Sequence, residues 1–175
     1  MQSIPSSVGN PGAATDTNST RKTLRAIATA GAVVGVLDAA DGVAYFGVTA
    51  GNNPIEVLQY IASGALGPSA FSGGLAAAGL GALIHFALAY GSAGVFVLAW
   101  SRVDAIRRRG LAAGLAWGAA VWALMNLVVL PMSNVPPSPI TALSAIHGIL
   151  AHALFVGLPA AVVARRVLGE NGNER

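Results

Sequence analysis

Six polar side chains interrupt the apolar stretches of this 175-residue chain, and their types suit proton exchange or small-solute binding. They are Asp38, Asp41, His85, Asn126, His147 and His152. Asp38 and Asp41 are three residues apart, so a helix would place both carboxyl groups on one face. An Asp at the centre of a membrane span costs about 2.5–3.5 kcal/mol, which exceeds the gain from several apolar residues. We therefore expect both carboxyl groups to face the interior of a helix bundle or a wet cavity.

The expected depths of these residues in a membrane group them into two layers. Counted inward from the predicted outer helix ends at about 1.5 Å per residue, the first layer lies at roughly 8–14 Å and the second at roughly 16–18 Å. The first layer contains Asp41, Asn126 and His147, and the second contains Asp38, His85 and His152. Each layer therefore draws its members from three different predicted helices.

Four kinds of chemistry fit these residues. A path for protons or a small solute would use the carboxyl and imidazole groups as titratable steps. A metal site would combine imidazoles with a carboxylate, but His147 and His152 lie about 140° apart around a helix, which makes a shared ion difficult. A b-type haem would need two facing imidazoles, for which His85 and His152 are the matching pair. The fourth alternative is structural, with interhelical hydrogen bonds worth about 0.6–2 kcal/mol each.

The composition is typical of a membrane protein. The chain is 10% charged and 54% hydrophobic, whereas soluble domains average roughly 25% and 45–50%. Its lack of cysteine excludes disulfides, thiolate catalysis and cysteine-ligated metal clusters. The net charge of +3 comes from basic clusters beside apolar runs, which indicates membrane orientation and not nucleic-acid binding. The sequence contains no phosphate-binding loop, serine nucleophile motif or paired-histidine zinc motif, so we expect neither enzymatic activity nor a cofactor.

Four apolar segments are long enough to cross a membrane, which takes roughly 20 residues. They are predicted at residues 26–50, 74–100, 110–131 and 139–164. Lys and Arg occur before the first span, between the second and third, and after Ala164, so the positive-inside rule predicts that both termini are cytoplasmic. The transmembrane domain is predicted at 21–166, between a flexible polar tail at 1–20 and a short polar tail at 167–175.

A short helix is predicted at residues 54–66, in the outer loop between the first two spans. Asn53, Pro54 and Glu56 supply an N-cap, a proline at the first helical position and a capping-box acid. Apolar residues then recur at helical spacing, at Ile55, Leu58, Ile61, Ala62 and Ala65, and the other faces carry Glu56, Gln59 and Ser63. About a dozen residues are too few to span, so we expect an amphipathic helix on the outer surface or in the mouth of the bundle.

Two proline positions and a series of small residues complete the pattern. Ser138-Pro139 predicts the start of the fourth span, and Pro159 predicts a kink near its inner end. In lipid, small residues four apart favour close helix association. Such residues occur at Gly31/Gly35, Gly47/Gly51, Gly74/Ala78 and Gly110/Gly114/Gly118.

From the second span onward, the chain resembles the YagU-like family of small bacterial inner-membrane proteins. The resemblance covers about residues 74–166 and is carried by His85-Phe86, the arginine-bearing loop before Gly110-Leu-Ala-Ala-Gly114, Val129-Leu130-Pro131-Met132, Pro136-Pro137, and the region from His147-Gly148 through His152 to Arg165-Arg166. The first span and the outer helix depart from the family pattern. The resemblance implies a bacterial inner-membrane location and an association with acid resistance.

These observations predict an all-α, integral membrane four-helix bundle with both termini cytoplasmic and a short amphipathic outer helix. The leading functional hypothesis is a non-enzymatic protein that handles protons or a small solute through the two polar layers. The alternative is an accessory or assembly subunit whose glycine faces and outer helix dock a larger membrane complex. The expected partners are the lipid bilayer and either further copies of the chain or such a complex.

Overall fold

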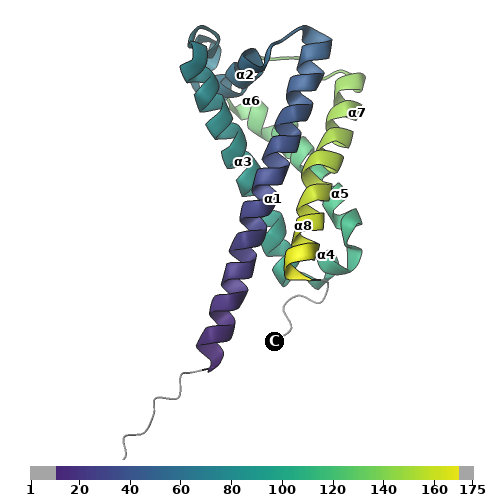
Figure 1. The fold of residues 1–175 in the computed structure, drawn as a ribbon. Helices are drawn as coiled ribbons and strands as arrows, with labels where there is room; N and C mark the ends of the chain where they lie inside the picture. The colour runs from purple at the N-terminus through teal and green to yellow at the C-terminus, as the bar shows by residue number, and fades with distance from the viewer. Residues whose placement is uncertain (1–10, 170–175) are drawn as a thin grey trace, which may run out of the picture.

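The computed structural model describes residues 11–169, which form an all-α bundle of four long helices (Figure 1). These helices are long and apolar enough to cross a membrane, at Thr17–Ala50, Gly74–Arg102, Leu111–Met132 and Ala142–Leu168. A helix satisfies its main-chain hydrogen bonds within one segment, so an apolar chain rich in Ala, Gly and Leu folds this way in lipid. The predicted all-α bundle of four membrane-length helices is confirmed.

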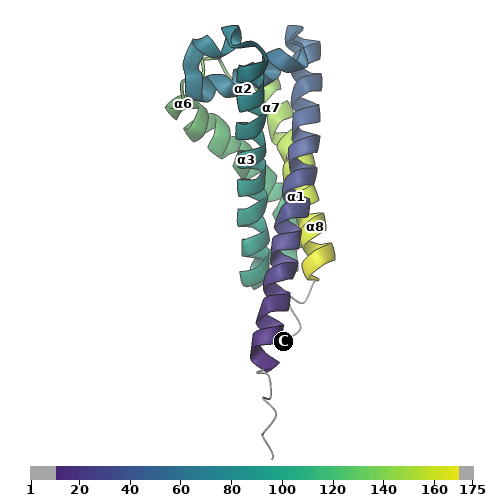
Figure 2. The same cartoon turned by 60° about the vertical axis from the view of Figure 1, so that its left-hand side comes forward.

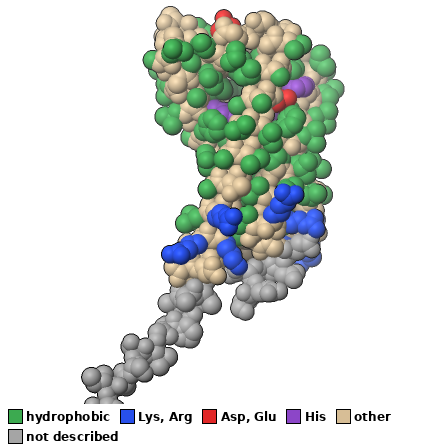
Figure 3. All heavy atoms as spheres, in the orientation of Figure 1, with side chains coloured by type: hydrophobic (Ala, Val, Ile, Leu, Met, Phe, Trp, Pro, Cys, Tyr) green, Lys and Arg blue, Asp and Glu red, His purple; other side chains and the backbone are tan. Residues whose placement is uncertain are grey.

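The bundle has two distinct ends. At the terminal end, α1 (Pro11–Ala50) begins, α8 (Leu158–Leu168) ends, and the short helix α4 (Asp104–Arg109) joins the second span to the third. At the loop end lie α2 (Pro54–Leu66), the 3-10 helix η1 (Gly67–Ser72) and the loop 133–141. Lys and Arg side chains gather at the terminal end, below a broad hydrophobic zone (Figure 3).

The first helix begins earlier than the sequence predicts. α1 has 40 residues and is therefore about 60 Å long, and its N-terminal end projects beyond the rest of the bundle (Figure 1). The predicted flexible tail is wrong over residues 11–20, which are helical, because a helix already formed in the membrane extends at little cost and Pro11 suits its first position. Residues 1–10 and 170–175 of the two predicted tails lie outside the described residues.

The third and fourth spans each contain a π-helical segment. The third span consists of α5 (Leu111–Leu124), η2 (Met125–Val129) and α6 (Leu130–Met132). The fourth consists of α7 (Ala142–Ala151), η3 (His152–Gly157) and α8. Pro131 and Pro159 are each the second residue after a π segment, behind Leu130 and Leu158. Because proline lacks an amide hydrogen and crowds the preceding turn, a wider turn before it relieves the clash. At Pro159 the irregularity predicted from the sequence takes this form.

The fourth span begins at Ala142, and the prediction that it begins at Ser138-Pro139 is wrong. Thr141 is the N-cap, with its hydroxyl accepting a hydrogen bond from the amide of Ser144 at 3.1 Å. Ser144 returns the contact by accepting from the amide of Thr141 at 3.0 Å. The prolines before Thr141 favour extended backbone, so the helix begins at Thr141, the first capping residue that follows them.

The short helix α2 packs into the bundle at the loop end. Its predicted capping box is present, because Asn53 Oδ1 accepts from the amide of Glu56 at 3.1 Å and Glu56 Oε2 accepts from the amide of Asn53 at 2.8 Å. The predicted apolar face is wrong in part, since Gln59 and Ser63 are buried and Ile55 is exposed. The side-chain amide of Gln59 donates to the carbonyl of Gly74 at 3.1 Å, at the start of α3 (Gly74–Arg102). This hydrogen bond offsets the cost of burying the polar side chain.

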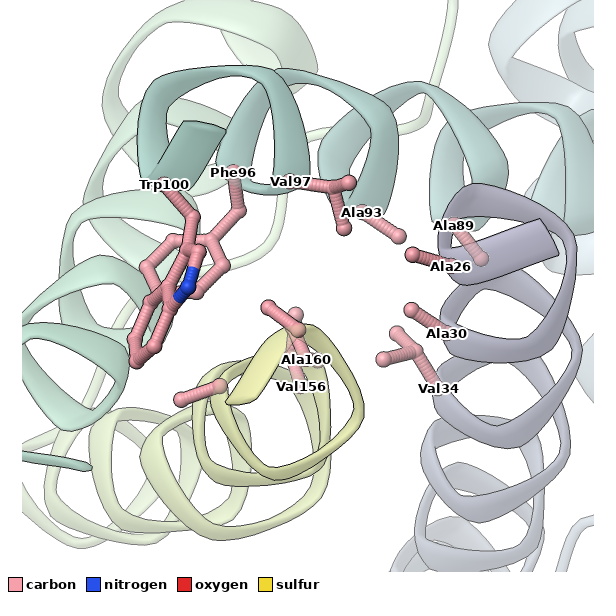
Figure 4. Packing of buried hydrophobic residues seen from close by; sticks show 12 residues of the cluster. Ala26, Ala30, Val34, Ala89, Ala93, Phe96, Val97, Trp100, Val156 and Ala160 are labelled. Carbon is pink, nitrogen blue, oxygen red and sulfur yellow. The ribbon is translucent and has the colours of Figure 1, made fainter. Parts of the chain in front are cut away.

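The apolar core lies in the terminal half of the bundle, where α1, α3 and α8 meet (Figure 4). Trp100 and Phe96 on α3 are its largest buried side chains, and their rings lie 6.1 Å apart. The remaining contacts from α1 and the fourth span come mainly from alanine and valine, which lets the helix axes approach closely. A smaller cluster of Ala62, Ala70 and Ala77 holds α2 and η1 against α3.

Several of the predicted glycines pack against other helices of the same chain. A Cβ added at Gly118 would clash with the main chain at His152, and one at Gly114 would lie 2.6 Å from the carbonyl oxygen of Gly157. On α1, Gly31 and Gly35 lie against the rings of Tyr90 and Phe86. Three of the other predicted positions differ, since Gly51, Gly74 and Gly110 have positive φ angles at helix ends. The glycine series therefore marks two interhelical contacts and three turns.

Candidate functional site

A cavity of about 1100 Å³ occupies the loop end of the bundle. In Figures 1 and 2 the third span leans away from α7 toward this end, so helices that touch at Gly118 separate near Pro131. The cavity is lined by α1, α2, α3, the third span, the loop 133–141 and the loop-end part of the fourth span. The loop is attached to α2, because the amide of Asn134 donates to the carbonyl of Gly64 at 3.1 Å.

All six polar residues selected from the sequence line this one cavity. None of the described residues that line it is Lys or Arg. Acidic and histidine side chains also reach the surface within the hydrophobic zone (Figure 3). The structure thus places the polar residues of both predicted layers around a common space.

Asp41 and His147 form the first carboxylate–imidazole pair, between α1 and α7. Asp41 Oδ1 lies 3.5 Å from His147 Nε2. Tyr45, one turn further along α1, stacks on the same imidazole with ring centroids 4.0 Å apart and an interplanar angle of 14°. The carboxylate and the phenol ring therefore orient His147 together, although 35% of its side chain remains exposed.

Asp38 and His85 form the second pair, between α1 and α3. His85 Nε2 lies 2.9 Å from the carbonyl oxygen of Gly35, and Nδ1 lies 4.0 Å from Asp38 Oδ2. Because a carbonyl oxygen only accepts, Nε2 must carry a hydrogen, so Nδ1 of a neutral imidazole faces the carboxylate with a lone pair. At 4.0 Å these two atoms are too far apart for a direct hydrogen bond, so the pair is an electrostatic contact.

Asn126 and His152 line the cavity without joining either pair. Asn126 Nδ2 donates to the carbonyl of Trp122 at 3.0 Å, and His152 Nδ1 donates to the carbonyl of Gly148 at 2.9 Å. Both bonds lie within the residue's own helix. Depth counting thus matched Asp41 with His147 and Asp38 with His85, whereas the third member of each predicted layer forms a local bond.

Four aromatic residues of the cavity were not among the residues selected for the site, namely Tyr45, Phe46, Tyr60 and Trp122. Tyr45 is one turn after Asp41, and that spacing could have identified it. Phe46 and Tyr60 come from α1 and α2, and their rings lie 6.1 Å apart. Burial raises the pKa of Tyr60 above its ordinary value of 10.0, so its phenol is neutral at physiological pH. No simple sequence signal links Phe46 to Tyr60, because their contact depends on how α2 folds back.

The geometry also bears on the metal and haem alternatives. Within residues 11–169, no group of three or more His, Asp or Glu side chains is arranged to hold a metal ion. His85 bonds the Gly35 carbonyl through Nε2 and turns Nδ1 toward Asp38, so haem iron at either nitrogen would have to displace one of these contacts.

Comparisons with protein-family models, curated proteins and solved structures find no match to this chain. The resemblance to the YagU-like family therefore stays a prediction.

Proposed function

We propose that this multi-pass membrane protein is not an enzyme but binds a small solute and exchanges protons in the loop-end cavity. The main support is that the pairs Asp38–His85 and Asp41–His147 line one cavity of about 1100 Å³. Its volume is slightly above that of ordinary ligand pockets, which is roughly 300–1000 Å³, so a small solute has room to bind. Interhelical hydrogen bonds alone would need no such space, whereas ionisable groups around it can gain and lose protons without separating the helices.

Proton exchange can be measured after reconstitution into liposomes that contain a pH-sensitive dye. After an external acid pulse, we expect the wild-type protein to speed internal acidification. Asp38→Asn and Asp41→Asn should each slow it by about tenfold or more, since each removes a titratable partner. Asp104→Asn is the matched control, because Asp104 pairs with Arg107 at the terminal end and does not line the cavity. Wild-type vesicles that acidify no faster than empty ones would contradict the proposal.

We further propose that the protein lies in a bacterial inner membrane with both termini cytoplasmic. The gathering of Lys and Arg at the terminal end supports this orientation (Figure 3). The chain contains no cysteine, so single cysteines at Ser72 and Ser138 can be labelled separately. In spheroplasts, an impermeant thiol reagent should modify both, whereas a cysteine at Thr20 should react only after lysis. Reaction of Ser72→Cys and Ser138→Cys only after lysis would reverse the orientation.

An association with acid resistance, implied by the resemblance to the YagU-like family, belongs to the same proposal. Cells that lack the gene should survive acid less well, and the wild-type gene should restore their survival. Complementation by Asp104→Asn but not by Asp41→Asn would connect that phenotype to the cavity. Equal restoration by both variants would separate it from the cavity.

The alternative role as an accessory subunit has less support from the geometry. It depended on glycine faces and on the outer helix, but Gly31, Gly35, Gly114 and Gly118 contact other parts of the same chain. α2 likewise turns its buried face to α3. Isolation in mild detergent separates the two roles, because a stoichiometric second protein would favour the subunit and its absence would favour the solute-binding role.

A further inference from the structure

The cavity has an asymmetric set of charges. Its lining contains two carboxyl groups and no permanently cationic side chain. The titratable groups that face it are Asp38, Asp41 and Tyr45 on α1, Tyr60 on α2, His85 on α3, and His147 and His152 on the fourth span. With the imidazoles neutral and both carboxyl groups ionised, these side chains carry two negative charges. With all three imidazoles protonated, they carry one positive charge.

The remaining lining is largely apolar and aromatic. Tyr45 and Phe46 meet edge to face with centroids 5.3 Å apart, and Phe46 also lies against Tyr60. Trp122 contributes a further aromatic side chain from the third span. Aromatic faces attract cations, and they do so more strongly where water is excluded. Carboxylates beside aromatic walls therefore favour a ligand that is both positively charged and apolar.

We infer that the cavity binds an apolar organic cation and releases protons as it does so. This inference rests on the proposed function and specifies its substrate class. An inorganic cation fits less well, because within residues 11–169 the acidic and histidine side chains form no cluster of three suited to metal binding. A cation of drug-like size would fill the space and place its charge near Asp38 or Asp41.

Proton release follows from the charge on the lining. A cation raises the cost of a second positive charge on His85 or His147, so bound protons leave to bulk water as it enters. Acidification reverses the exchange, because protonated imidazoles repel the cation. The affinity for the cation should therefore rise with pH, and its binding should acidify a weakly buffered solution.

Tetraphenylphosphonium is a suitable probe, and tetraphenylborate is its control of similar size and opposite charge. Binding to the full-length protein in detergent can be measured by isothermal titration calorimetry. We expect saturable binding of the cation that strengthens about tenfold or more between about pH 5.5 and about pH 8. We expect no saturable binding of the anion at the higher pH.

Matched variants locate the binding site. Asp41→Asn should weaken cation binding by about tenfold or more, whereas Asp104→Asn should leave it unchanged. Phe46→Leu should weaken it about two- to fivefold, and Phe71→Leu, which lies in η1 outside the cavity, should have no effect. If Asp41→Asn does not fold, as judged by gel filtration and circular dichroism, Asp38→Asn provides the same test.

The outcomes separate this inference from the proposed function. Equal binding of both ions, binding that does not depend on pH, or an unchanged affinity in the folded Asp variant would overturn the substrate class. If wild-type liposomes still exchange protons in an Asp41-dependent way, the proposed function survives that result. If neither ion binds and no proton exchange occurs, both proposals fail.

Discussion

The terminal half and the loop half of this bundle are built from similar Ala- and Gly-rich helices, yet the terminal half contains the main apolar core and the loop half contains the cavity lined by both carboxylate–imidazole pairs. In the terminal half, α3 and α8 meet through Val97, Trp100 and small residues such as Ala160 (Figure 4). In the loop half, the third span leans away from α7, and the space is lined by aromatic and ionisable side chains.

The difference shows how small residues set the shape of a bundle in lipid. Because apolar side chains gain little by leaving lipid, close backbone contact is a main source of helix association. Gly114, Gly118 and Gly157 provide that contact where the third span crosses the fourth, which we call the glycine crossing. Beyond it, larger residues such as Trp122 occupy the contact side, so the helices separate and polar groups face the gap.

The largest expected effect comes from filling the glycine crossing. Gly118→Leu should prevent the third and fourth spans from closing, because even a Cβ at this site would meet the main chain at His152. We expect destabilisation of about 3 kcal/mol or more, or no folded protein. Gly79→Leu is the control, since Gly79 has open space beside it. Gel filtration and thermal unfolding in detergent compare the two, and equal behaviour would contradict the tight crossing.

Next in size is the removal of the largest core side chain. Trp100 is fully buried in the terminal half, so Trp100→Ala should cost about 3 kcal/mol through lost contacts and a cavity. Trp100→Phe should retain most of this stability. Thermal melts of both variants test whether packing, rather than the bond from Trp100 Nε1 to the carbonyl of Gly169, is the main contribution. Similar losses in the two variants would identify the hydrogen bond as decisive.

A smaller effect is expected at the entrance to α2, in the loop half. Asn53→Ala removes the side chain that caps two amides and should destabilise this helix by about 1 kcal/mol. Faster hydrogen exchange at the amides of α2, with little change in the terminal half, is the expected result. Asn52→Ala serves as the control because Asn52 is not the cap. Uniform changes in both halves would mean that they unfold as one unit.

The smallest effect on stability is expected in the cavity itself. Asp41→Leu removes the contact with His147 but also removes the cost of holding a carboxylate in the bundle. We expect a change in unfolding free energy within about 1 kcal/mol, measured by thermal melts, together with loss of proton exchange. A large loss of stability with unchanged proton exchange would assign Asp41 a structural role.

The start of α1 is one feature that the sequence predicted wrongly, because the helix includes residues 11–20 of the predicted tail. Polar composition before Arg21 predicted a tail, because such residues bury too little surface to fold alone. In the structure residues 11–20 extend the membrane-spanning part of α1 toward the N-terminus. Extending an existing helix costs less than starting a new one, so their polar composition matters less. The start of the fourth span similarly depended on the local choice between Ser138 and Thr141 as the cap.

Much of the candidate site could be anticipated from residue types and depth. The cost of placing Asp38 and Asp41 in lipid required polar or wet surroundings, and counting along the helices matched each with a histidine. Rotation about the helix axes was not available from the sequence, so the local bonds of Asn126 and His152 could not be foreseen. The same missing rotation hid the contribution of Tyr60.

By itself, the sequence determined four membrane-length helices and the short capped helix, because hydropathy, charge and capping act locally along the chain. Only the tertiary structure decided which glycines meet another helix, which face of α2 is buried, and that the two carboxylate–imidazole pairs share one cavity. These features depend on the tilt and rotation of whole helices. Many side-chain contacts set those variables together, and no single segment of the sequence encodes them.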